Sequence, residues 1–265
     1  MPYLHLICDY APGDMAWAEL YSAFTACVPE TMRIHMSSVA PFDTVATGFM
    51  LAQLALGSKE LRPEGLIVFA NCAPRKDIKE ARQRNEGEGL LYGITKDEVP
   101  IIAVNSGFSL SFLRGDIKLW STDAQEHGSQ FRSRDYFPRI VAAAAQGDFS
   151  FKQHELDPLA VVPEPPKSCI GYIDSFGNIK TTIRTDDELV KALKPGQRLK
   201  VRIGNQIRAA TVATGSFNVL EGELAFAPGS SGHDRRFWEL FKRGDSAWRE
   251  FAQPATGTKL HFVLP

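Results

Sequence analysis

Cysteine is scarce in this sequence of 265 residues, and its distribution excludes two common roles. The four cysteines are Cys8, Cys27, Cys72 and Cys169, and no two of them form a C-x-x-C pair. Such spacing is typical neither of a thiolate metal site nor of a ladder of disulfides. Because unpaired cysteines persist in reducing compartments, we expect a cytoplasmic protein.

Long apolar segments and an excess of one charge are also missing. No segment approaches the roughly 18 unbroken apolar residues of a transmembrane helix, and the first apolar run meets Asp9 too early for a signal peptide. The 30 Lys and Arg residues balance 31 Asp and Glu residues, which gives a net charge of −1. Without a strong field of one sign, we expect neither a nucleic-acid partner nor a membrane partner.

Several sequence signatures of common sites do not occur. No G-x-G-x-x-G follows the first strand-like run, and neither G-x-x-x-x-G-K-[ST] nor G-x-S-x-G is found. These absences argue against the usual dinucleotide and nucleoside triphosphate sites and against a serine hydrolase of the α/β type. The six histidines show no i,i+4 pairing of the kind that binds zinc. We expect neither a metal nor a separate cofactor.

The first 150 residues alternate between strand-like and helix-like patterns. Strand-like runs lie at 4–8, 31–38 and 65–71, with helix-like stretches at 17–28 and 44–56 between them. Two more strand-like runs and a final helix-like stretch follow at 89–94, 99–105 and 140–147. This alternation predicts an α/β protein whose residues 1–150 form a mixed, mostly parallel α/β sandwich.

A proline-rich segment follows this first domain. Four prolines lie between positions 158 and 166, a density that disfavours helix and central strand, so we predict a linker at 151–167. Residues 168–265 show short runs of alternating polarity separated by turn residues, with one helix-like stretch at 237–245. These runs predict a smaller C-terminal β-barrel domain.

The ends of the predicted strands are the first place to look for a site, because doubly wound sheets bind ligands beyond the carboxyl ends of their strands. The residues at these ends are Asp9, Ser37, Asn71 and Asn105. We favour a ligand for Asp9, whose carboxylate accepts hydrogen bonds from hydroxyl or amino groups. Asp14 can serve the same ligand or cap the helix that begins near Met15.

Three further segments combine polar and aromatic residues. At 39–44, Phe42 and Asp43 stand together at a helix start, where Asp43 is either a cap or a site residue. At 131–137, F-R-S-R-D-Y-F places two arginines, a serine and an aspartate in an aromatic frame. An internal Arg134–Asp135 pair or a cap would explain part of this set, but its density favours a site. At 173–183 a D-S-F-G-N turn interrupts a strand, and a plain hairpin with Gly177 and Asn178 at its turn is the alternative to a binding site.

Together these segments resemble the motifs of one enzyme superfamily. C-D-Y-A-P-G-D at 8–14 is similar to T-D-F-G-x-x-D, and V-A-P-F-D-T at 39–44 to a segment with a stacking aromatic residue. The 131–137 segment resembles F-H-G-R-D and F-Y-S-R-E, and I-D-S-F-G-N-I-K-T-T-I at 173–183 resembles D-x-F-G-N-x-x-T-N-I. The order agrees along nearly the whole chain, which therefore resembles the S-adenosyl-L-methionine (SAM) hydroxide adenosyltransferases and their relatives, the fluorinase and the chlorinase.

The resemblance implies an N-terminal α/β domain and a C-terminal β-barrel, with SAM held between them and between neighbouring subunits of a homotrimer. SAM would be substrate or ligand, with no other cofactor. The implied reaction is an in-line displacement at the 5′ carbon of SAM, in which methionine leaves as a neutral thioether and water or halide attacks. The protein must then align the nucleophile and strip its hydration.

The matched positions imply roles for individual residues. Asp9 would hold the ribose hydroxyls and Phe42 would flank the ligand. Asp174 would bind the methionine ammonium and Asn178 the adenine, within a motif that also keeps Phe176. G-S-S-G at 229–232 resembles the N-S-x-G turn of the family, so that Ser230 would contact the methionine carboxylate.

The nucleophile side departs from the family pattern. Asn71 stands where the hydrolases have the aspartate of their water-handling triad, and Arg132 stands where they have a histidine; neither side chain accepts a proton near neutral pH. The arginine of the triad could survive as Arg75 or Arg82. Ser133 matches the halide-contacting serine of the fluorinase. The catalytic candidates are therefore Asn71, Arg75, Arg132 and Ser133.

These departures leave three hypotheses open. The chain could displace methionine from SAM with water, which yields adenosine, or with another small nucleophile, and its arginines suit an anion. It could instead bind or sense SAM or adenosine without turnover. A third hypothesis keeps the fold but changes the ligand to another nucleoside.

Overall fold

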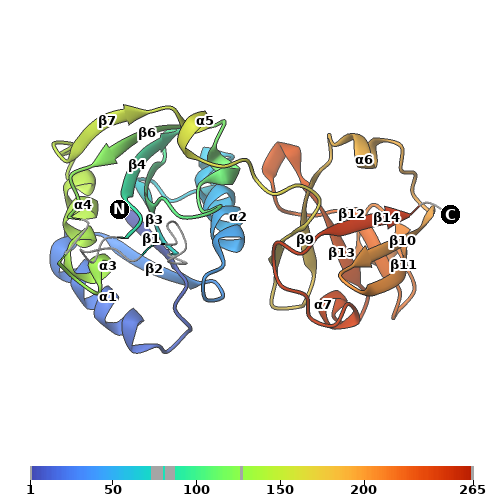
Figure 1. Ribbon diagram of the computed structural model, residues 1–265. Helices are drawn as coiled ribbons and strands as arrows, with labels where there is room; N and C mark the ends of the chain where they lie inside the picture. The colour runs from blue at the N-terminus through green and yellow to red at the C-terminus, as the bar shows by residue number, and fades with distance from the viewer. Residues whose placement is uncertain (1, 73–79, 81–86, 126–127, 264–265) are drawn as a thin grey trace. The chain divides into compact units, whose positions relative to one another are not determined.

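The computed structural model describes residues 2–72, 80, 87–125 and 128–263 of the chain. The chain divides into two compact units, Met1–Glu164 and Pro165–Pro265. Each unit contains one seven-stranded sheet, and helices accompany both sheets (Figure 1). The protein is therefore of the mixed α/β class.

The sheet of the first unit is mixed. Its strands are β1 (Tyr3–Cys8), β2 (Arg33–Ser38), β3 (Leu66–Asn71), β4 (Leu90–Thr95), β5 (Pro100–Val104), β6 (Ile117–Thr122) and β7 (Lys152–Leu156), in the order β2-β1-β3-β5-β4-β6-β7. β1 pairs in parallel with β2 and β3, and β3 pairs in parallel with β5. β4 and β7 run antiparallel to their neighbours. The carboxyl ends of β2, β1, β3 and β5 consequently share one edge.

Helices cover both faces of this sheet (Figure 1). They are α1 (Met15–Cys27), α2 (Thr44–Ala55), α3 (Arg132–Asp135), α4 (Phe137–Ala145) and α5 (Pro158–Val161), with 3₁₀ turns at Lys59–Leu61 and Ser111–Leu113. The buried side of α1 carries Trp17, Leu20 and Phe24, a helical spacing that turns one stripe toward the sheet. This stripe shares a core with α4 and with the alternate β1 residues Leu4 and Leu6.

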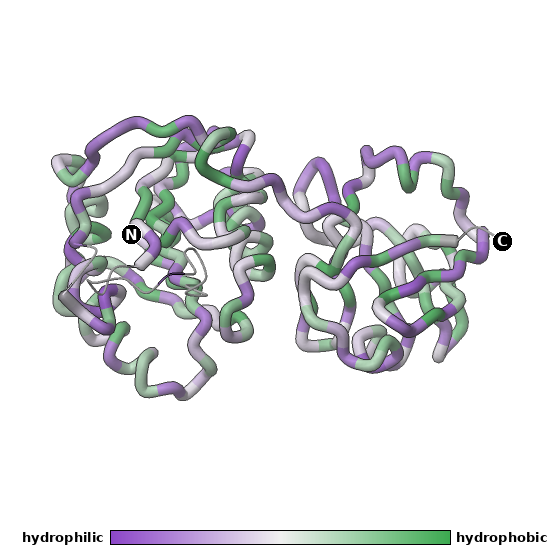
Figure 2. The backbone as a smooth tube through the Cα atoms, in the orientation of Figure 1, coloured by the Kyte–Doolittle hydropathy of each residue, from purple (hydrophilic) through white to green (hydrophobic). Residues whose placement is uncertain are grey.

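Most of the range 151–167, which the sequence predicts as a linker, is folded into the first unit. β7 lies within this range and pairs with β6, so the first unit extends to Glu164. Its KQHEL sequence is largely exposed, and β7 is hydrophilic in Figure 2, because it forms the edge of the sheet. The side chain of Arg114 donates to the carbonyl oxygens of Leu159 and Val162, which ties the proline-rich segment to the first unit.

The sheet of the second unit is mostly antiparallel. Its strands are β8 (Ile170–Ile173), β9 (Ile179–Arg184), β10 (Arg198–Ile203), β11 (Gln206–Val212), β12 (Leu224–Pro228), β13 (Phe237–Lys242) and β14 (Leu260–Val263), in the order β14-β10-β11-β12-β13-β9-β8. Among the strand pairs of the described residues in this unit, only β11 and β12 pair in parallel. A bridge between Cys169 and Lys259 joins the residues just before β8 and β14, the two ends of this order.

The prediction of a helix at 237–245 is wrong, because Phe237–Lys242 forms strand β13, which pairs with β12 and β9. Its apolar residues are buried in the sheet core rather than along one helical stripe. The helices of this unit are α6 (Glu188–Lys191) and α7 (Ala247–Glu250), and 3₁₀ turns lie at Ser216–Asn218 and His233–Arg235. Leu199, Val201 and Ile203 alternate inward along β10, as a half-buried strand requires.

Candidate functional site

The strand register gathers polar residues at the carboxyl edge of the first sheet. Cys8, the last residue of β1, lies beside Ser38 of β2 and Asn71 of β3. Asp9 and Tyr10 continue beyond β1 at this edge. We use the name polar edge for Asp9, Tyr10, Asn71, Cys72 and Ser133. Sequence reasoning identified three of the five, since it missed Tyr10 and Cys72.

Tyr10 links two predicted catalytic candidates. The Asn71 amide nitrogen donates to the Tyr10 phenol oxygen at 2.9 Å, and this oxygen lies 3.1 Å from Ser133 Oγ. Asn71 and Ser133 are buried. Since the phenol oxygen accepts from Asn71, its O–H can donate to Ser133. The 8–14 and 131–137 segments, far apart in sequence, therefore meet through one hydroxyl.

The aromatic frame predicted around 131–137 surrounds the Tyr10 ring. Its ring meets Trp17 and Phe131 edge to face, with centroid separations of 5.8 and 5.9 Å. Trp17 Nε1 donates to the Tyr10 carbonyl oxygen at 3.0 Å. Burial raises the pKa of Tyr10 above its ordinary value, and the hydrogen bond with Ser133 only partly offsets this. The phenol is therefore protonated at neutral pH and acts as a hydrogen-bond donor rather than a base.

Asp9 organises the turn that carries Phe42. Asp9 Oδ2 accepts a hydrogen bond of 3.0 Å from the Phe42 backbone N–H. Phe42 has φ of 65°, a left-handed conformation that is uncommon for a bulky residue and is often held at functional sites. Its side chain is 57% exposed. The structure thus brings Asp9 and Phe42 together, with the aromatic ring open to solvent and acceptor positions left on the carboxylate.

Two acidic residues near this edge are helix caps. Asp14 accepts from the backbone N–H of Ala16 at the start of α1, and Asp43 accepts from that of Ala46 at the start of α2. Both arrangements satisfy N–H groups that a helix N-terminus leaves without partners. Capping therefore accounts for Asp14 and Asp43.

The two cysteines at this edge are poor nucleophiles. Burial raises the pKa of the Cys72 thiol, and the charge of Asp9 raises it further. Burial also raises the pKa of Cys8. Because the thiolate is the reactive form, both cysteines are inert thiols near neutral pH. Their place at the site is structural.

The Arg132 side chain contacts the backbone just before β4. Its Nη1 donates to the Glu88 carbonyl oxygen at 3.1 Å, and its guanidinium lies 5.7 Å from the centroid of the Phe137 ring. A Cβ on Gly87 would overlap this guanidinium.

The Glu88 side chain is buried, and its Oε1 has no hydrogen-bond partner within the described part of the chain. Glu88 was not among the residues predicted from the sequence. The two candidate arginines of the triad, Arg75 and Arg82, lie outside the described residues.

The second unit holds the predicted ligand contacts of the D-S-F-G-N turn. Asp174 Oδ1 accepts from the backbone N–H groups of Phe176 and Asn178, both at 3.0 Å, and Oδ2 accepts from Asn178 Nδ2 at 2.9 Å. Gly177 has φ of 79° and no room for a Cβ because Ser246 lies against it. Phe176 is 78% exposed. β8 and β9 thus form the predicted hairpin, and the Asp174 side chain stabilises its turn through these three hydrogen bonds.

Ser230 lies in the same part of the second unit. Its backbone N–H donates to Glu239 Oε1 at 3.2 Å, and this carboxylate pairs with Lys180, whose Nζ is 3.9 Å from Asp174 Oδ2. Glu239 and Lys180 therefore connect Ser230 to the Asp174 turn. Neither linking residue was a sequence candidate.

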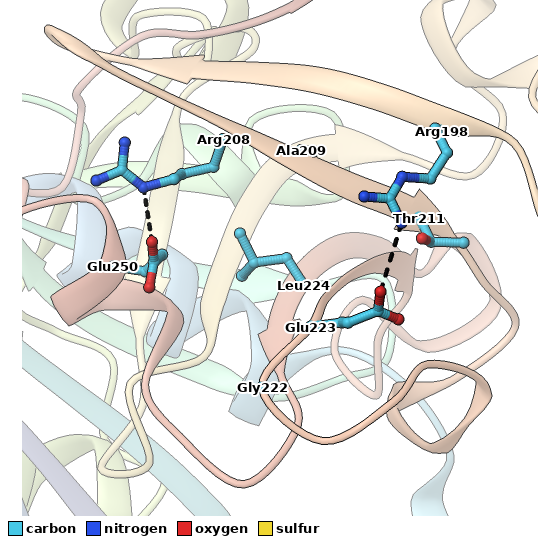
Figure 3. Close-up of a pocket in the computed structure, with 8 residues that line it drawn as sticks. All are labelled: Arg198, Arg208, Ala209, Thr211, Gly222, Glu223, Leu224 and Glu250. Carbon is cyan, nitrogen blue, oxygen red and sulfur yellow. Dashed lines mark hydrogen bonds and ion pairs between the residues drawn. The ribbon is translucent and has the colours of Figure 1, made fainter.

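Two cavities lie away from every predicted site residue. One, of about 220 Å³, is lined in the second unit by Arg198 and Arg208, each paired with a glutamate (Figure 3). The other, of about 580 Å³, lies at the amino ends of the first sheet's strands beside Gly65 and Pro100. Both arginines of the first cavity already have carboxylate partners. The second cavity lies at the end of the strands opposite to the polar edge.

The described residues show neither a metal cluster nor a membrane span. Within the ranges that the structure describes, no group of three or more His, Cys, Asp or Glu side chains is placed to hold a metal ion. No helix in the described ranges combines the length and the apolar character needed to span a bilayer.

Comparison with known proteins shows the fold. No family model and no curated protein matches the chain. A solved structure of an uncharacterized conserved protein from Thermotoga maritima matches with 18% identity and a TM-score of 0.74, over 98% of this chain and 100% of that one. A conserved hypothetical protein from Thermus thermophilus matches with 16% identity and a TM-score of 0.67, over 99% and 100%. At these identities the likeness is one of fold, which this chain shares with both proteins.

Proposed function

We propose that this chain binds SAM with the ribose at the polar edge and displaces methionine from its 5′ carbon with a small nucleophile. The observation that carries the proposal is the Asn71–Tyr10–Ser133 hydrogen-bond chain beside Asp9. Residues from two segments that the resemblance matches, 8–14 and 131–137, meet Asn71 at the edge where α/β sheets bind ligands. A scaffold role alone does not require this convergence.

In this proposal Asp9 accepts hydrogen bonds from the ribose hydroxyls through the acceptor positions that Phe42 leaves open. The exposed Phe42 ring flanks the ligand. The resemblance assigns the ammonium, the adenine and the carboxylate of SAM to Asp174, Asn178 and Ser230, with Phe176 in the same turn. In the second unit, a hydrogen bond and two ion pairs through Glu239 and Lys180 connect Ser230 with Asp174, which supports grouping these two residues.

The nucleophile attacks the 5′ carbon in line with the breaking carbon–sulfur bond, whose electron pair goes to sulfur, so that methionine leaves as a neutral thioether. Attacking water must also lose a proton. Asn71 cannot take it, and the raised pKa of Tyr10 keeps the phenol protonated. An anion needs no proton acceptor and would receive hydrogen bonds from Asn71 Nδ2 and Ser133 Oγ. We therefore favour an anionic nucleophile over water.

The same observation supports a second candidate function. Because the Asn71–Tyr10–Ser133 chain holds no base at neutral pH, the site also suits a protein that binds or senses SAM or adenosine without turnover.

The proposal extends to architecture and location. The bridge between Cys169 and Lys259 supports a C-terminal β-barrel, since it connects the two ends of the strand order. The parallel pairs around β1 and β3 support a mostly parallel α/β sandwich for the N-terminal unit. A homotrimer and a cytoplasmic location remain parts of the proposal.

Turnover separates the two candidate functions. The purified protein at high concentration is incubated with SAM in halide-free buffer and in chloride or fluoride buffer, and adenosine-containing products are measured by liquid chromatography with mass spectrometry. A 5′-halogenated product supports displacement by an anion, and adenosine with methionine supports a hydrolase. Unchanged SAM that stays bound through gel filtration supports the binding function, and SAM that neither reacts nor binds contradicts the proposal.

A further inference from the structure

The second unit contains a largely buried ion pair between neighbouring strands. Lys180 on β9 and Glu239 on β13 lie opposite each other in the antiparallel register. Lys180 Nζ is 2.9 Å from Glu239 Oε1, and the side chains are 12% and 1% exposed. Burying two charges is costly, and a buried pair is weak evidence for stability. A contribution to stability therefore does not by itself explain why Lys180 and Glu239 are paired here.

Glu239 has a second partner in the turn that precedes β13. Its Oε1 also accepts from the backbone N–H of Ser230 at 3.2 Å. Gly229 packs so closely on the carboxylate that a Cβ there would overlap it. The Glu239 carboxylate is therefore fixed in place by a backbone donor and by a glycine that leaves it space.

Lys180 has two carboxylates within reach but bonds one of them. Its Nζ is 2.9 Å from Glu239 Oε1 and 3.9 Å from Asp174 Oδ2. The shorter distance is a charge-assisted hydrogen bond, and the longer one is beyond hydrogen-bond range. The fixed Glu239 carboxylate thus holds the ammonium of Lys180 away from Asp174.

The charges of this cluster leave one negative charge unmatched. Lys180 carries one positive charge against the two carboxylates of Asp174 and Glu239. Because Glu239 is paired at close range, the unmatched charge is that of Asp174, which is also the most exposed of the three at 22%. Its remaining hydrogen bonds come from neutral donors in its own turn. Asp174 is therefore available to a cationic group of a ligand.

We propose that Glu239 is a specificity-determining, positioning residue, which sequesters the Lys180 ammonium so that Asp174 selects ligands with a positively charged amino group. Glu239 acts through Lys180 and Asp174 and does not touch the ligand. This inference rests on the proposed function, in which Asp174 binds the amino group of SAM.

The test compares SAM with 5′-methylthioadenosine, a nucleoside that lacks the amino-acid part, by isothermal titration calorimetry on the full chain. Glu239→Gln keeps the side-chain shape and an acceptor for Ser230 but frees Lys180 to pair with Asp174. We expect SAM affinity to fall at least about 10-fold, the equivalent of about 1.4 kcal/mol, while the affinity for 5′-methylthioadenosine stays within about two-fold of wild type.

A second variant identifies the freed lysine as the cause. Glu239→Gln combined with Lys180→Met removes both charges, so Asp174 again carries an unmatched negative charge, and SAM affinity should recover most of its loss. A purely structural role for the pair predicts no such recovery. The matched control is Glu250→Gln, which breaks ion pairs with Arg208 and Lys242 in the same unit and should change neither affinity.

Each outcome decides one question. Equal loss of both ligands in Glu239→Gln, or no recovery in the double variant, overturns the specificity role while the proposed function stands. Unchanged SAM affinity in Glu239→Gln overturns it as well. A wild-type protein that binds neither ligand contradicts the proposed function, and the inference fails with it. If Glu239→Gln does not fold, the double variant, which buries no unpaired charge, must still bind SAM with near wild-type affinity.

Discussion

The side-chain amide of Asn71 donates a hydrogen bond of 2.9 Å to the phenol oxygen of Tyr10, although the two residues are 61 positions apart. The partners lie at the ends of neighbouring parallel strands, β3 and β1, whose register brings Asn71 beside Cys8. An asparagine here keeps its bond to Tyr10 without adding a charge or a base. The Asn71–Tyr10–Ser133 chain is therefore ordered by hydrogen bonds but offers no group that takes up a proton near neutral pH.

Tyr10→Phe should disrupt the polar edge from its centre. The change removes the hydroxyl that Asn71 and Ser133 share and leaves two buried polar groups unpaired. We expect a loss of about 1–3 kcal/mol in the free energy of unfolding, measured by urea denaturation, together with weaker SAM binding. Tyr21→Phe on the exposed side of α1 is the control and should change neither quantity. Wild-type stability in Tyr10→Phe would show that the three residues do not form a network.

Ser133→Ala should lower turnover more than binding. If Ser133 donates to the nucleophile, kcat for methionine release should fall about 10- to 100-fold with little change in KM for SAM. Ser111→Ala is a matched control, because its buried Oγ has no hydrogen-bond partner among the described residues. That variant should be as stable as wild type or slightly more so, since no bond is lost. An unchanged kcat in Ser133→Ala would remove Ser133 from the catalytic candidates.

Gly177→Ala should destabilise the second unit through crowding as well as backbone strain. Gly177 and Gly196 both have positive φ, 79° and 88°, but only Gly177 has Ser246 against the position of a Cβ. Alanine at either position is strained, so Gly196→Ala isolates the backbone contribution. We expect Gly177→Ala to lose about 1–3 kcal/mol more than Gly196→Ala in chemical denaturation. Equal losses would mean that the turn moves away from Ser246 without penalty.

His5 should make the first unit less stable in mild acid. Burial, helped by the charge of His35, lowers the pKa of His5 from 6.5 to about 4. The unfolded chain therefore takes up this proton first, and the stability contributed by neutral His5 is complete above pH 6.5 and is lost as the pH falls toward 4. With allowance for partial solvent screening, the loss is about 2 kcal/mol.

The measurement is the free energy of unfolding at several pH values between 7.5 and 4 for wild type and His5→Gln. The variant should show a shallower decline, because its glutamine takes up no proton. His154→Gln, on the exposed edge strand β7, should follow the wild-type curve. Parallel curves for wild type and His5→Gln would contradict the assigned role of His5.

Periodicity predicted most of the first unit because its central strands and helices are strongly apolar. Helices predicted at 17–28 and 44–56 are observed at Met15–Cys27 and Thr44–Ala55. β7 was missed because an edge strand needs no apolar run, and its KQHEL sequence is largely exposed. The helix predicted at 237–245 was wrong because a strand buried on both faces has a continuous apolar pattern, which also fits a buried helix segment.

The site was predictable where a parallel strand ends in a polar residue. Asp9 and Asn71 follow this rule, but Tyr10 resembles an ordinary core aromatic until its hydroxyl is seen between Asn71 and Ser133. Glu88 was not predicted because it precedes β4, which runs antiparallel to β5, so that β4 starts at the edge where β5 and its parallel neighbour β3 end. Contacts of this kind depend on strand order, which periodicity does not supply.

The most direct test of the account is calorimetric titration of SAM into wild type and Asp9→Asn, with exposed Asp148→Asn as the control. Asn at position 9 keeps an acceptor for the Phe42 N–H but loses the charge that a ribose diol would contact. We predict saturable binding to wild type and Asp148→Asn and an affinity about 10- to 100-fold lower for Asp9→Asn. Equal affinities for all three proteins, or no binding of SAM to wild type, would contradict a SAM site at the polar edge.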